Sequence, residues 1–511
     1  MNRRRFLASI GAASASTLLA GCPSMSDDHP SNTNTARNIE GMPGNTTHSA
    51  RAGDRQGNGS QSGPSTRPTQ PPKSDTVRYG IEFDRVIDVV DDLGADPTGT
   101  EPVDDIIDEH YEDGVLLEFP PGSFLVERTH SFDENVNGWG MVGTGSSLRD
   151  VEFVFPKGNN TATDPDNHYV LNVQSGRNHV VANMVMQQTR DRVTGVGFII
   201  VISDGLHVEN LEFAGYNPVS GRNPGTCLIP DVTDIRGTGV VKNFICTGGG
   251  VEDTYPARKV GILCGPFHVG ELKLLGHDIR NMGSHPHYTS NHRGCIRTEN
   301  CYFENNDNTN IRISGGLNGG HPKKESWVRN CTILVDTDDA DHLPEGERYE
   351  FVRGIKCDYG QDVLIADTDV VFKSAPASPY CIGVQHNHGK ATLKNVRIHS
   401  AINGIGPLFE AQGNKDPVVL ENVNFTGTAS EFYDTEAGIS VRGRNNSVIR
   451  NCCINLRGGD QNGISIRNAE GCRIEDVAIA VPGEDIVTNN ARPVVSGVHD
   501  DAECPAASVD S

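Results

Sequence analysis

The amino-acid sequence predicts an all-β protein whose short strands stack into a parallel β-helix. A six-residue pattern recurs along most of the chain, a second set of short strands runs in step with it, and no helical periodicity separates the two sets. A repeat of this length indicates stacked supersecondary units and not one compact globule.

The repeated pattern reads apolar, variable, Asn or Asp, small apolar, variable, apolar, and it is clearest over residues 328–333. Apolar and polar residues alternate in it, as they do in a short strand with one buried face. Ten intervals between the first and last polar anchors span 293 residues, a mean of about 29. The anchors are Asn183, Asn210, Asn243, Asn300, Asn330, Asp367, Asn395, Asn422, Asn451 and Asp476, with a degenerate copy at Glu271.

A second set of alternating strands is set off by Gly and Asn within the same periods. Two or three strands per period without a helix do not fit a leucine-rich horseshoe or a propeller blade. They do fit one coil of a parallel β-helix, of which we expect about eleven. The Asn of each coil is expected to stack on the next and to satisfy backbone groups of the turn. The second set comprises residues 261–264, 311–313, 354–357, 438–441 and 463–466.

Residues 1–22 are expected to be a delivery signal and not part of the fold. The run Arg-Arg-Arg-Phe-Leu at 3–7 resembles the twin-arginine export motif, and the run Leu-Ala-Gly-Cys at 19–22 resembles a lipobox, in which Cys22 becomes lipidated. We therefore expect export by the twin-arginine route and a lipid anchor on the outer face of the cell membrane. The alternative is a frayed N-terminus with a chance cysteine.

The rest of the chain divides by composition and by the repeat. Residues 23–75 are rich in Ser, Thr, Asn, Gly and Pro and nearly lack large apolar residues, which predicts a disordered linker. An N-terminal cap with the first strands is expected at 76–135, the β-helix at 136–490 and a flexible tail at 491–511.

Composition limits the partners and the metal sites to be expected. A net charge of -23 argues against nucleic acid as a partner, because binding phosphates needs a basic surface. An acidic, lysine-poor exported lipoprotein is typical of a halophilic archaeon. There is no Cys-x-x-Cys pair, so a zinc site of ordinary spacing is not expected. Most thiols are expected to be buried, with room for an isolated disulfide.

A short helix is expected just before the first coil. Val103, Ile106, Ile107, His110 and Tyr111 follow at the i, i+3, i+4, i+7 and i+8 positions of one helical face. A helix placed there would cap the open end of a β-helix, where apolar side chains and unpaired strand edges are otherwise exposed.

The opening module carries a family resemblance. A strand, the Gly-Ala-Asp turn at 94–96, the helix and the Phe-Pro-Pro-Gly-x-Phe-Leu-Val run at 119–126 resemble the start of pectate-lyase superfamily proteins. The chain departs from that pattern at 96–101, where the family usually has a denser Asp-Gly-x-x-Asp-Asp loop. The resemblance implies a right-handed parallel β-helix. It does not imply one activity, since members include lyases, hydrolases, epimerases and binders.

Outward positions of the second strand set form the first candidate site. If the apolar residues of these strands point into the coil, then Arg312, Lys356 and Asp358 point outward on adjacent coils. Such cations can neutralise a uronate carboxylate while a basic group takes the neighbouring proton, so we predict these three residues as catalytic. Gln385 and Arg442, on later coils, are predicted to bind substrate. The alternative is a solvated charged face.

The segment 276–293 is the densest polar cluster between repeats. It is expected to be a loop that overhangs the groove, in which histidines act as general acid or base. Pro286 prevents its histidines from sharing a helical face, and the alternative is a solvated polar loop. The predicted catalytic residues are His277 and His287, and the predicted substrate-binding residues are Asp278, Arg280, His285, His292 and Arg293.

A calcium ion is possible at the polar turn 304–310, which could supply oxygen ligands, although an asparagine-rich structural turn explains it as well. No metal ligand and no other cofactor is predicted with certainty.

Three functions remain open. The first is a lyase that cleaves an acidic, uronate-containing glycan by β-elimination, and the second is a non-catalytic glycan-binding adhesin. The third is a hydrolase, because Gly276-His277-Asp278 and Arg312-Ile313-Ser314 partly resemble the motif pair of polygalacturonases. Ser314 stands where that family has Lys, and no Asp pair precedes His277, so hydrolysis ranks below elimination. A monomer and a trimer are both open.

Overall fold

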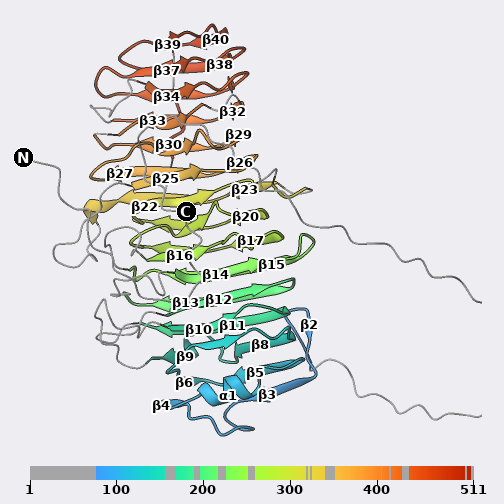
Figure 1. Ribbon diagram of the computed structural model, residues 1–511. Helices are drawn as coiled ribbons and strands as arrows, with labels where there is room; N and C mark the ends of the chain where they lie inside the picture. Colours follow the sequence, from blue (N-terminus) through green and yellow to red (C-terminus); the bar gives the residue numbers. More distant parts are fainter. Residues whose placement is uncertain are drawn as a thin grey trace, which may run out of the picture. The chain divides into compact units, whose positions relative to one another are not determined.

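Three parallel β-sheets run along the described part of the chain, and successive coils add strands to each of them (Figure 1). The signal segment 1–22 with Cys22 and the linker 23–75 lie outside the described residues. This computed structural model describes residues 76–511 except 156–167, 189–195, 217–225, 251–258, 318–319, 323–324, 340–351, 404, 414–415, 429–436, 501–502 and 508–511.

The first sheet lies at the right of Figure 1, and each of its strands pairs in parallel with the equivalent strand of the next coil. Its strands are β3 (Arg85–Asp88), β5 (Val115–Phe119), β8 (Asn137–Gly143), β11 (Arg177–Gln187), β13 (Leu206–Ala214), β15 (Thr238–Cys246), β17 (Glu271–Leu275), β20 (Cys295–Glu299), β23 (Ser326–Arg329), β26 (Val363–Ala366), β29 (Ala391–Lys394), β32 (Val418–Glu421), β35 (Val448–Arg450), β38 (Arg473–Ala480) and β40 (Val494–His499).

The second sheet follows the first after a corner in each coil. The long strands β11, β13, β15 and β38 pass through that corner and belong to both sheets. The other strands of the second sheet are β4 (Thr98–Pro102), β6 (Gly122–Leu125), β9 (Val151–Val154), β18 (Asp278–Arg280), β21 (Tyr302–Glu304), β24 (Thr332–Asp336), β27 (Asp369–Ser374), β30 (Arg397–Ser400), β33 (Asn424–Gly427) and β36 (Cys453–Leu456).

The third sheet has 13 strands and carries the candidate site. Its strands are β7 (His130–Phe132), β10 (His168–Val173), β12 (Val196–Ile202), β14 (Thr226–Val232), β16 (Val260–Leu263), β19 (His287–Thr289), β22 (Asn308–Ile313), β25 (Val352–Cys357), β28 (Ile382–Val384), β31 (Phe409–Ala411), β34 (Ala437–Arg442), β37 (Asn462–Arg467) and β39 (Ile486–Asn489).

The predicted fold class, an all-β right-handed parallel β-helix, is confirmed. The third sheet has more strands than the eleven coils expected, because β7 precedes the coil of the first anchor, Asn183, and β39 follows that of the last, Asp476. The cap is present as α1 (Asp104–Glu109), whose Ile107 is buried. A short antiparallel pair, β1 (Val77–Arg78) and β2 (Ile81–Glu82), precedes the coils.

The C-terminal end differs from the flexible tail expected at 491–511. Strand β40 pairs in parallel with β38 and so adds one more strand to the first sheet. Most side chains of β40 are exposed, so it lacks the apolar alternation by which the other strands were recognised. Beyond it, Cys504 forms a disulfide with Cys453 of β36, which attaches the last described residues to the second sheet.

The repeated Asn residues lie at the corner between the first and second sheets. All ten anchors have positive φ, between 49° and 58°, a conformation that Asn tolerates better than most residues other than Gly. Their amides form a ladder between coils. For example, Asn243 Nδ2 donates to Asn210 Oδ1 at 2.6 Å, and Asn330 Nδ2 donates to Asn300 Oδ1 at 2.7 Å. The predicted Asn stack is thus present, and its members turn the chain from one sheet to the next.

The degenerate anchor is Gly276, and not Glu271 as expected. Glu271 lies within β17 and pairs with Thr238 of β15, whereas Gly276 follows β17 with φ of 65° and takes the corner position. A corner needs positive φ, which Gly adopts without steric cost but Glu does not. The apolar residues around Glu271 match the repeat pattern, but they lie five residues before the corner.

A corner residue contributes to stability through its amide ladder and through its tolerance of positive φ. Two substitutions of Asn330 separate these contributions. Asn330→Gly keeps the backbone conformation and loses the amide ladder, and we expect it to lower the free energy of unfolding by about 0.5–1 kcal/mol. Asn330→Ala loses the ladder and also the tolerance of Asn for a φ of 49°, so its loss is expected to exceed that of Asn330→Gly by about 1 kcal/mol. Urea unfolding of both variants measures the difference, and equal losses would show that the backbone conformation contributes nothing.

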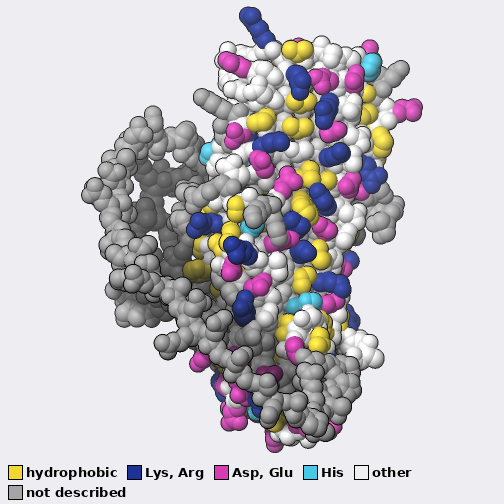
Figure 2. Space-filling view, turned by 90° about the vertical axis from the view of Figure 1, so that its right-hand side faces the viewer, with side chains coloured by type: hydrophobic (Ala, Val, Ile, Leu, Met, Phe, Trp, Pro, Cys, Tyr) yellow, Lys and Arg dark blue, Asp and Glu magenta, His cyan; other side chains and the backbone are white. Residues whose placement is uncertain are grey.

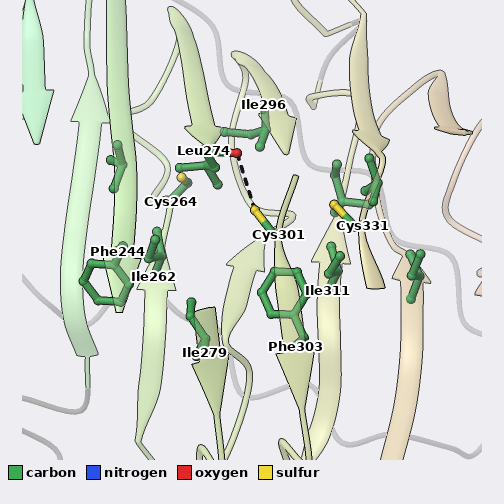
Figure 3. Close-up of a cluster of buried hydrophobic side chains, with 14 of the residues drawn as sticks. Phe244, Ile262, Cys264, Leu274, Ile279, Ile296, Cys301, Phe303, Ile311 and Cys331 are labelled. Carbon is green, nitrogen blue, oxygen red and sulfur yellow. Dashed lines mark hydrogen bonds between the residues drawn. The ribbon is translucent and has the colours of Figure 1, made fainter. Parts of the chain in front are cut away.

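The interior of the coils is filled by stacked apolar side chains, such as Phe244, Ile262, Ile279 and Phe303 (Figure 3). Cys301 lies among them and its thiol approaches the Leu274 carbonyl at 3.7 Å. The ten free cysteines of the described residues are all buried, as expected for thiols that serve as small apolar residues. No helix in the described ranges is long and apolar enough to cross a bilayer.

Candidate functional site

Arg312, Lys356 and Asp358 lie together on the outer face of the third sheet. Arg312 of β22 pairs directly with Lys356 of β25 in the ladder, and the neighbouring residues Ile313 and Cys357 lie in the core. Since side chains alternate along a strand, Arg312, Lys356 and Asp358 point away from the core. The sequence placed these three residues on one face, and the structure brings them into contact.

A carboxylate joins the two cations. Asp358 Oδ2 lies 2.6 Å from Arg312 Nη2 and 3.4 Å from Lys356 Nζ, and all three side chains are less than 15% exposed. Burial alone would raise the pKa of Asp358, but the charges of Arg312 and Lys356 and a hydrogen bond from Asn387 outweigh it and lower the pKa. Asp358 therefore stays ionised, and holds the cations in place.

Aromatic rings support the guanidinium. The Cζ of Arg312 lies 4.5 Å from the ring centroid of Tyr288 and 5.9 Å from that of Tyr359, distances typical of cation–π contacts. His285 stacks on Tyr288 at 4.8 Å, so this predicted binding residue borders the cluster through Tyr288. Sequence reasoning missed both tyrosines, because Tyr288 becomes a neighbour of Arg312 only through the register of β19 with β22.

On the next coils the same face continues with Tyr380, Gly383 and Glu410. Gly383 pairs with Lys356 on one side and with Glu410 on the other. The Tyr380 ring covers Gly383 so closely that a Cβ there would lie 2.3 Å from it, and Gln385 Nε2 donates to the Tyr380 hydroxyl at 2.9 Å. Gln385 is thus near the cluster as predicted, while Glu410 was not foreseen.

Arg442 lies farther along the face. It ends β34, is exposed, and pairs with Arg467 of β37. The structure places it on the predicted sheet but does not bring it into contact with Arg312, Lys356 or Asp358 in the described residues.

A fully buried arginine fixes the backbone beside the cluster. Arg444 donates to the carbonyl oxygens of Gln385 at 2.7 Å and His388 at 3.0 Å through Nη2, of Gly389 at 2.7 Å through Nη1, and of Gln412 at 2.6 Å through Nε. These carbonyls belong to neighbouring coils and lie beyond the ends of β28 and β31. Arg444 thereby positions the turn that presents Gln385.

His277 and His287 lie inside the coil and not beside Arg312. His277 Nδ1 and His287 Nε2 are 3.0 Å apart, and His277 Nε2 donates a hydrogen bond to the Val241 carbonyl at 3.0 Å. Burial lowers the pKa of His277 to about 4 and also lowers that of His287, so both rings are neutral at pH 7. Their position, with the ring of His287 packed on Phe303, is that of polar core residues.

The overhanging loop expected at 276–293 is instead part of a coil, with β18 and β19 formed within it. Asp278 and Arg280 lie on the second sheet, where Arg280 also pairs with Glu304. His292 is buried beside His268, and burial lowers its pKa to about 4, whereas Arg293 is exposed. The polar residues of this segment thus divide between the core, two sheets and the solvent.

The turn at 304–310 is built from buried amides that bind the backbone. Asn306 Nδ2 donates to the Ile279 carbonyl at 3.0 Å, and Asn310 Nδ2 donates to the Arg353 carbonyl at 3.0 Å. The side-chain oxygens that a calcium ion would need are also hydrogen-bonded: Asn306 Oδ1 accepts from the Met282 N–H at 2.9 Å and Asn310 Oδ1 accepts from Asn306 Nδ2 at 2.9 Å, which fits a structural turn. Among the described residues no three His, Cys, Asp or Glu side chains are grouped as metal ligands.

The first sheet has a different outer face, on which Lys and Arg alternate with Asp and Glu (Figure 2). Cations there pair with carboxylates on adjacent strands, as Lys242 does with Glu209 at 2.6 Å and Arg450 with Glu421 at 3.0 Å. Exposed pairs of this kind contribute little to binding or stability. This face is a solvated charged surface, in contrast to the buried cluster of the third sheet.

The sequence matches no known protein-family model and none of the curated proteins. Among solved structures, the A-module of a mannuronan C-5 epimerase from Azotobacter vinelandii matches with a TM-score of 0.43 and 12% identity, over 81% of this chain and 98% of that one. PfbA, a surface adhesin of Streptococcus pneumoniae, matches with a TM-score of 0.36 and 12% identity, over 84% and 96%. A GH87 alpha-1,3-glucanase from Streptomyces thermodiastaticus matches with a TM-score of 0.37 and 11% identity, over 84% and 71%. Likenesses this distant assign no activity to the chain.

Proposed function

We propose that the protein binds an acidic, uronate-containing glycan on the outer face of the third sheet and cleaves it by β-elimination. The observation that supports this most is the pair of cations, Arg312 and Lys356, which lie in register on adjacent coils around one carboxylate. A guanidinium has five N–H donors and can bind more than one carboxylate. A uronate carboxylate would then meet the same two charges that hold Asp358.

The chemistry assigns one role to each residue. Arg312 neutralises the uronate carboxylate, which makes the proton at C5 easier to remove. The Lys356 amine takes that proton, the electron pair forms the C4–C5 double bond, and the C4–O bond breaks. The leaving oxygen takes a proton from water. Because the amine must be unprotonated to act as base, turnover is expected to rise towards alkaline pH.

A second candidate is a non-catalytic glycan-binding adhesin. It is favoured by the contact of Asp358 with both cations, since a carboxylate beside Lys356 stabilises the ammonium form, which can bind an anion but cannot accept a proton. The same residues would then recognise the glycan without cleaving it.

The location of this activity is part of the proposal. The Arg-rich start of the chain and Cys22 support export by the twin-arginine route and a lipid anchor on the outer face of the cell membrane. An acidic surface polysaccharide would be the partner reached there.

Incubation with acidic polysaccharides separates the candidates. Elimination is expected to produce the ultraviolet absorbance of an unsaturated sugar together with new reducing ends. New reducing ends without that absorbance would indicate a hydrolase, in place of a lyase. Binding of the polysaccharide without either signal would indicate the adhesin, and absence of binding to every acidic glycan would overturn the proposed function.

A further inference from the structure

A cavity lies at the N-terminal end of the third sheet, where α1 approaches the strand β7. Its volume is about 460 Å³, within the range of sites that bind small molecules. β7 ends the 13-stranded sheet and pairs with β10, so the cavity lies at the edge of that sheet. The residues that line it are Asp108, Tyr111, Thr129, Ser131, Phe132 and Glu134. Two carboxylates, two hydroxyls and two aromatic rings therefore surround one space.

The apolar wall of this cavity is a pair of stacked rings. The ring centroids of Tyr111 and Phe132 lie 3.7 Å apart, with 6° between the ring planes. The Tyr111 hydroxyl lies 3.0 Å from His179 Nε2, a buried contact that fixes the ring in place. Both residues keep some exposed area, 9% for Tyr111 and 7% for Phe132. Such a wall offers apolar area to the C–H groups of a ring-shaped ligand and also attracts a cation.

The two hydroxyl groups of the cavity are available as donors. Thr129 Oγ1 accepts a hydrogen bond from the Tyr169 N–H at 3.1 Å, and Ser131 Oγ accepts one from Asn172 Nδ2 at 3.3 Å. A hydroxyl that already accepts a hydrogen bond still has its O–H to donate. Each hydroxyl can therefore donate to an oxygen atom of a ligand, and a ligand without oxygen atoms would leave both donors unused.

The two carboxylates of the cavity differ in their partners. Asp108 is already paired, because its Oδ1 lies 2.6 Å from His130 Nδ1 and its Oδ2 accepts from Arg128 Nη2 at 2.6 Å. Glu134 is exposed, and within the described residues its carboxylate accepts only from the Asp133 N–H, at 3.1 Å, and meets no cation. An ionised carboxylate can only accept hydrogen bonds, and the strongest come from charged donors. Glu134 therefore suits a ligand that carries an ammonium group.

The charge around the cavity favours the same kind of ligand. Residues 104–134 contain ten Asp and Glu, one Arg and no Lys. A field of this sign repels anions and attracts cations, so a uronate is disfavoured here. Six ladder steps, about 29 Å, separate Ser131 from Arg312 along the third sheet. The cavity is thus distinct from the cation cluster in position and in charge.

We propose that this cavity binds an amino sugar, that is, a sugar ring that carries a protonated amine. The stacked rings pack against the sugar, the hydroxyls of Thr129 and Ser131 donate to its hydroxyl oxygens, and Glu134 accepts from its ammonium group. A neutral sugar would leave the carboxylate without a charged donor, and a simple amine would leave the two hydroxyl donors unused. The inference does not depend on the proposed function, because the two sites share no residue.

Binding of three monosaccharides to the full chain at pH 6 tests the site, with affinities measured by titration in ligand-observed NMR. Glucosamine carries a cation at this pH, since an amine keeps its proton, whereas glucose is neutral and glucuronate is an anion. Wild type is expected to bind glucosamine about 10-fold more tightly than glucose, the effect of one hydrogen bond between charged groups. Glucuronate is expected to bind more weakly than glucose.

Three variants assign this preference to the cavity. Glu134→Gln keeps the size of the side chain and removes its charge, so it is expected to lower the affinity for glucosamine to that for glucose. Ser131→Ala is expected to weaken binding of both sugars by about 5-fold, the effect of one neutral hydrogen bond. Glu470→Gln removes an exposed carboxylate near the other end of the β-helix, and as the matched control it is expected to change neither affinity.

Three results would overturn the inference. If wild type binds glucosamine no more tightly than glucose, the cavity does not recognise an ammonium group. If Glu134→Gln keeps the preference, the charge that selects the amine lies outside the cavity. If none of the three monosaccharides shows saturable binding, the cavity is not a sugar site.

Discussion

Arg312→Ala is expected to lower turnover of an acidic glycan by about 100- to 1000-fold, the usual effect of losing one group that stabilises developing charge. The guanidinium holds Asp358 at 2.6 Å and lies over Tyr288. Without it, no cation remains at that ladder position to neutralise the uronate, and Asp358 repels the substrate. Initial rates followed by the absorbance of the unsaturated product measure the loss.

Two further variants make this result specific. Lys356→Ala is expected to reduce kcat with a smaller change in KM, because removal of the proton acceptor affects the chemical step more than binding. Lys394→Ala removes an exposed cation of β29 on the first sheet and serves as the matched control, with no change in rate. Equal rates for wild type and Arg312→Ala would exclude Arg312 from the site.

The fold was predictable because it depends on local signals that every coil repeats. Each corner needs a residue of positive φ, which selects Asn, and each strand buries one face, which produces alternation. The prediction was wrong where a residue other than Asn adopts the positive φ of the corner, as Gly276 does at the corner assigned to Glu271. It was also wrong at β40, which is bound by backbone pairing to β38 and buries little surface.

The candidate site was predictable in part, for a related reason. Alternation within β22 and β25 placed Arg312 and Lys356 outward, and their register happened to align them. The neighbour Tyr288 could not be found this way, since coils of unequal length hide which residues share a ladder row. The expectation that His277 and His287 face the groove was wrong. It assumed that polar side chains are exposed, whereas a hydrogen-bonded histidine pair can fill a core.

Asp231→Asn is expected to raise the free energy of unfolding by about 4 kcal/mol at pH 8. Burial raises the pKa of Asp231 from 3.8 to about 7, although the Gly265 N–H opposes the shift. The unfolded chain releases this proton near pH 3.8 and the folded chain only near 7. Below pH 4 the group is protonated in both states and costs no stability. The free energy of unfolding therefore falls as the pH rises from about 4 to 7, and it stays lower above pH 7. Asn does not ionise, so the free energy of unfolding of the variant does not fall in this way.

Urea unfolding of wild type and Asp231→Asn at pH 4, 6 and 8 measures this effect. The variants are expected to be nearly equal at pH 4 and to diverge up to pH 8, whereas a constant difference would show that Asp231 ionises normally in the folded chain. A buried carboxyl that destabilises the protein, where the isosteric amide would not, is hard to explain by folding alone. Natural proteins keep such groups where function requires them, and the gain in stability of the variant measures what this group costs the fold.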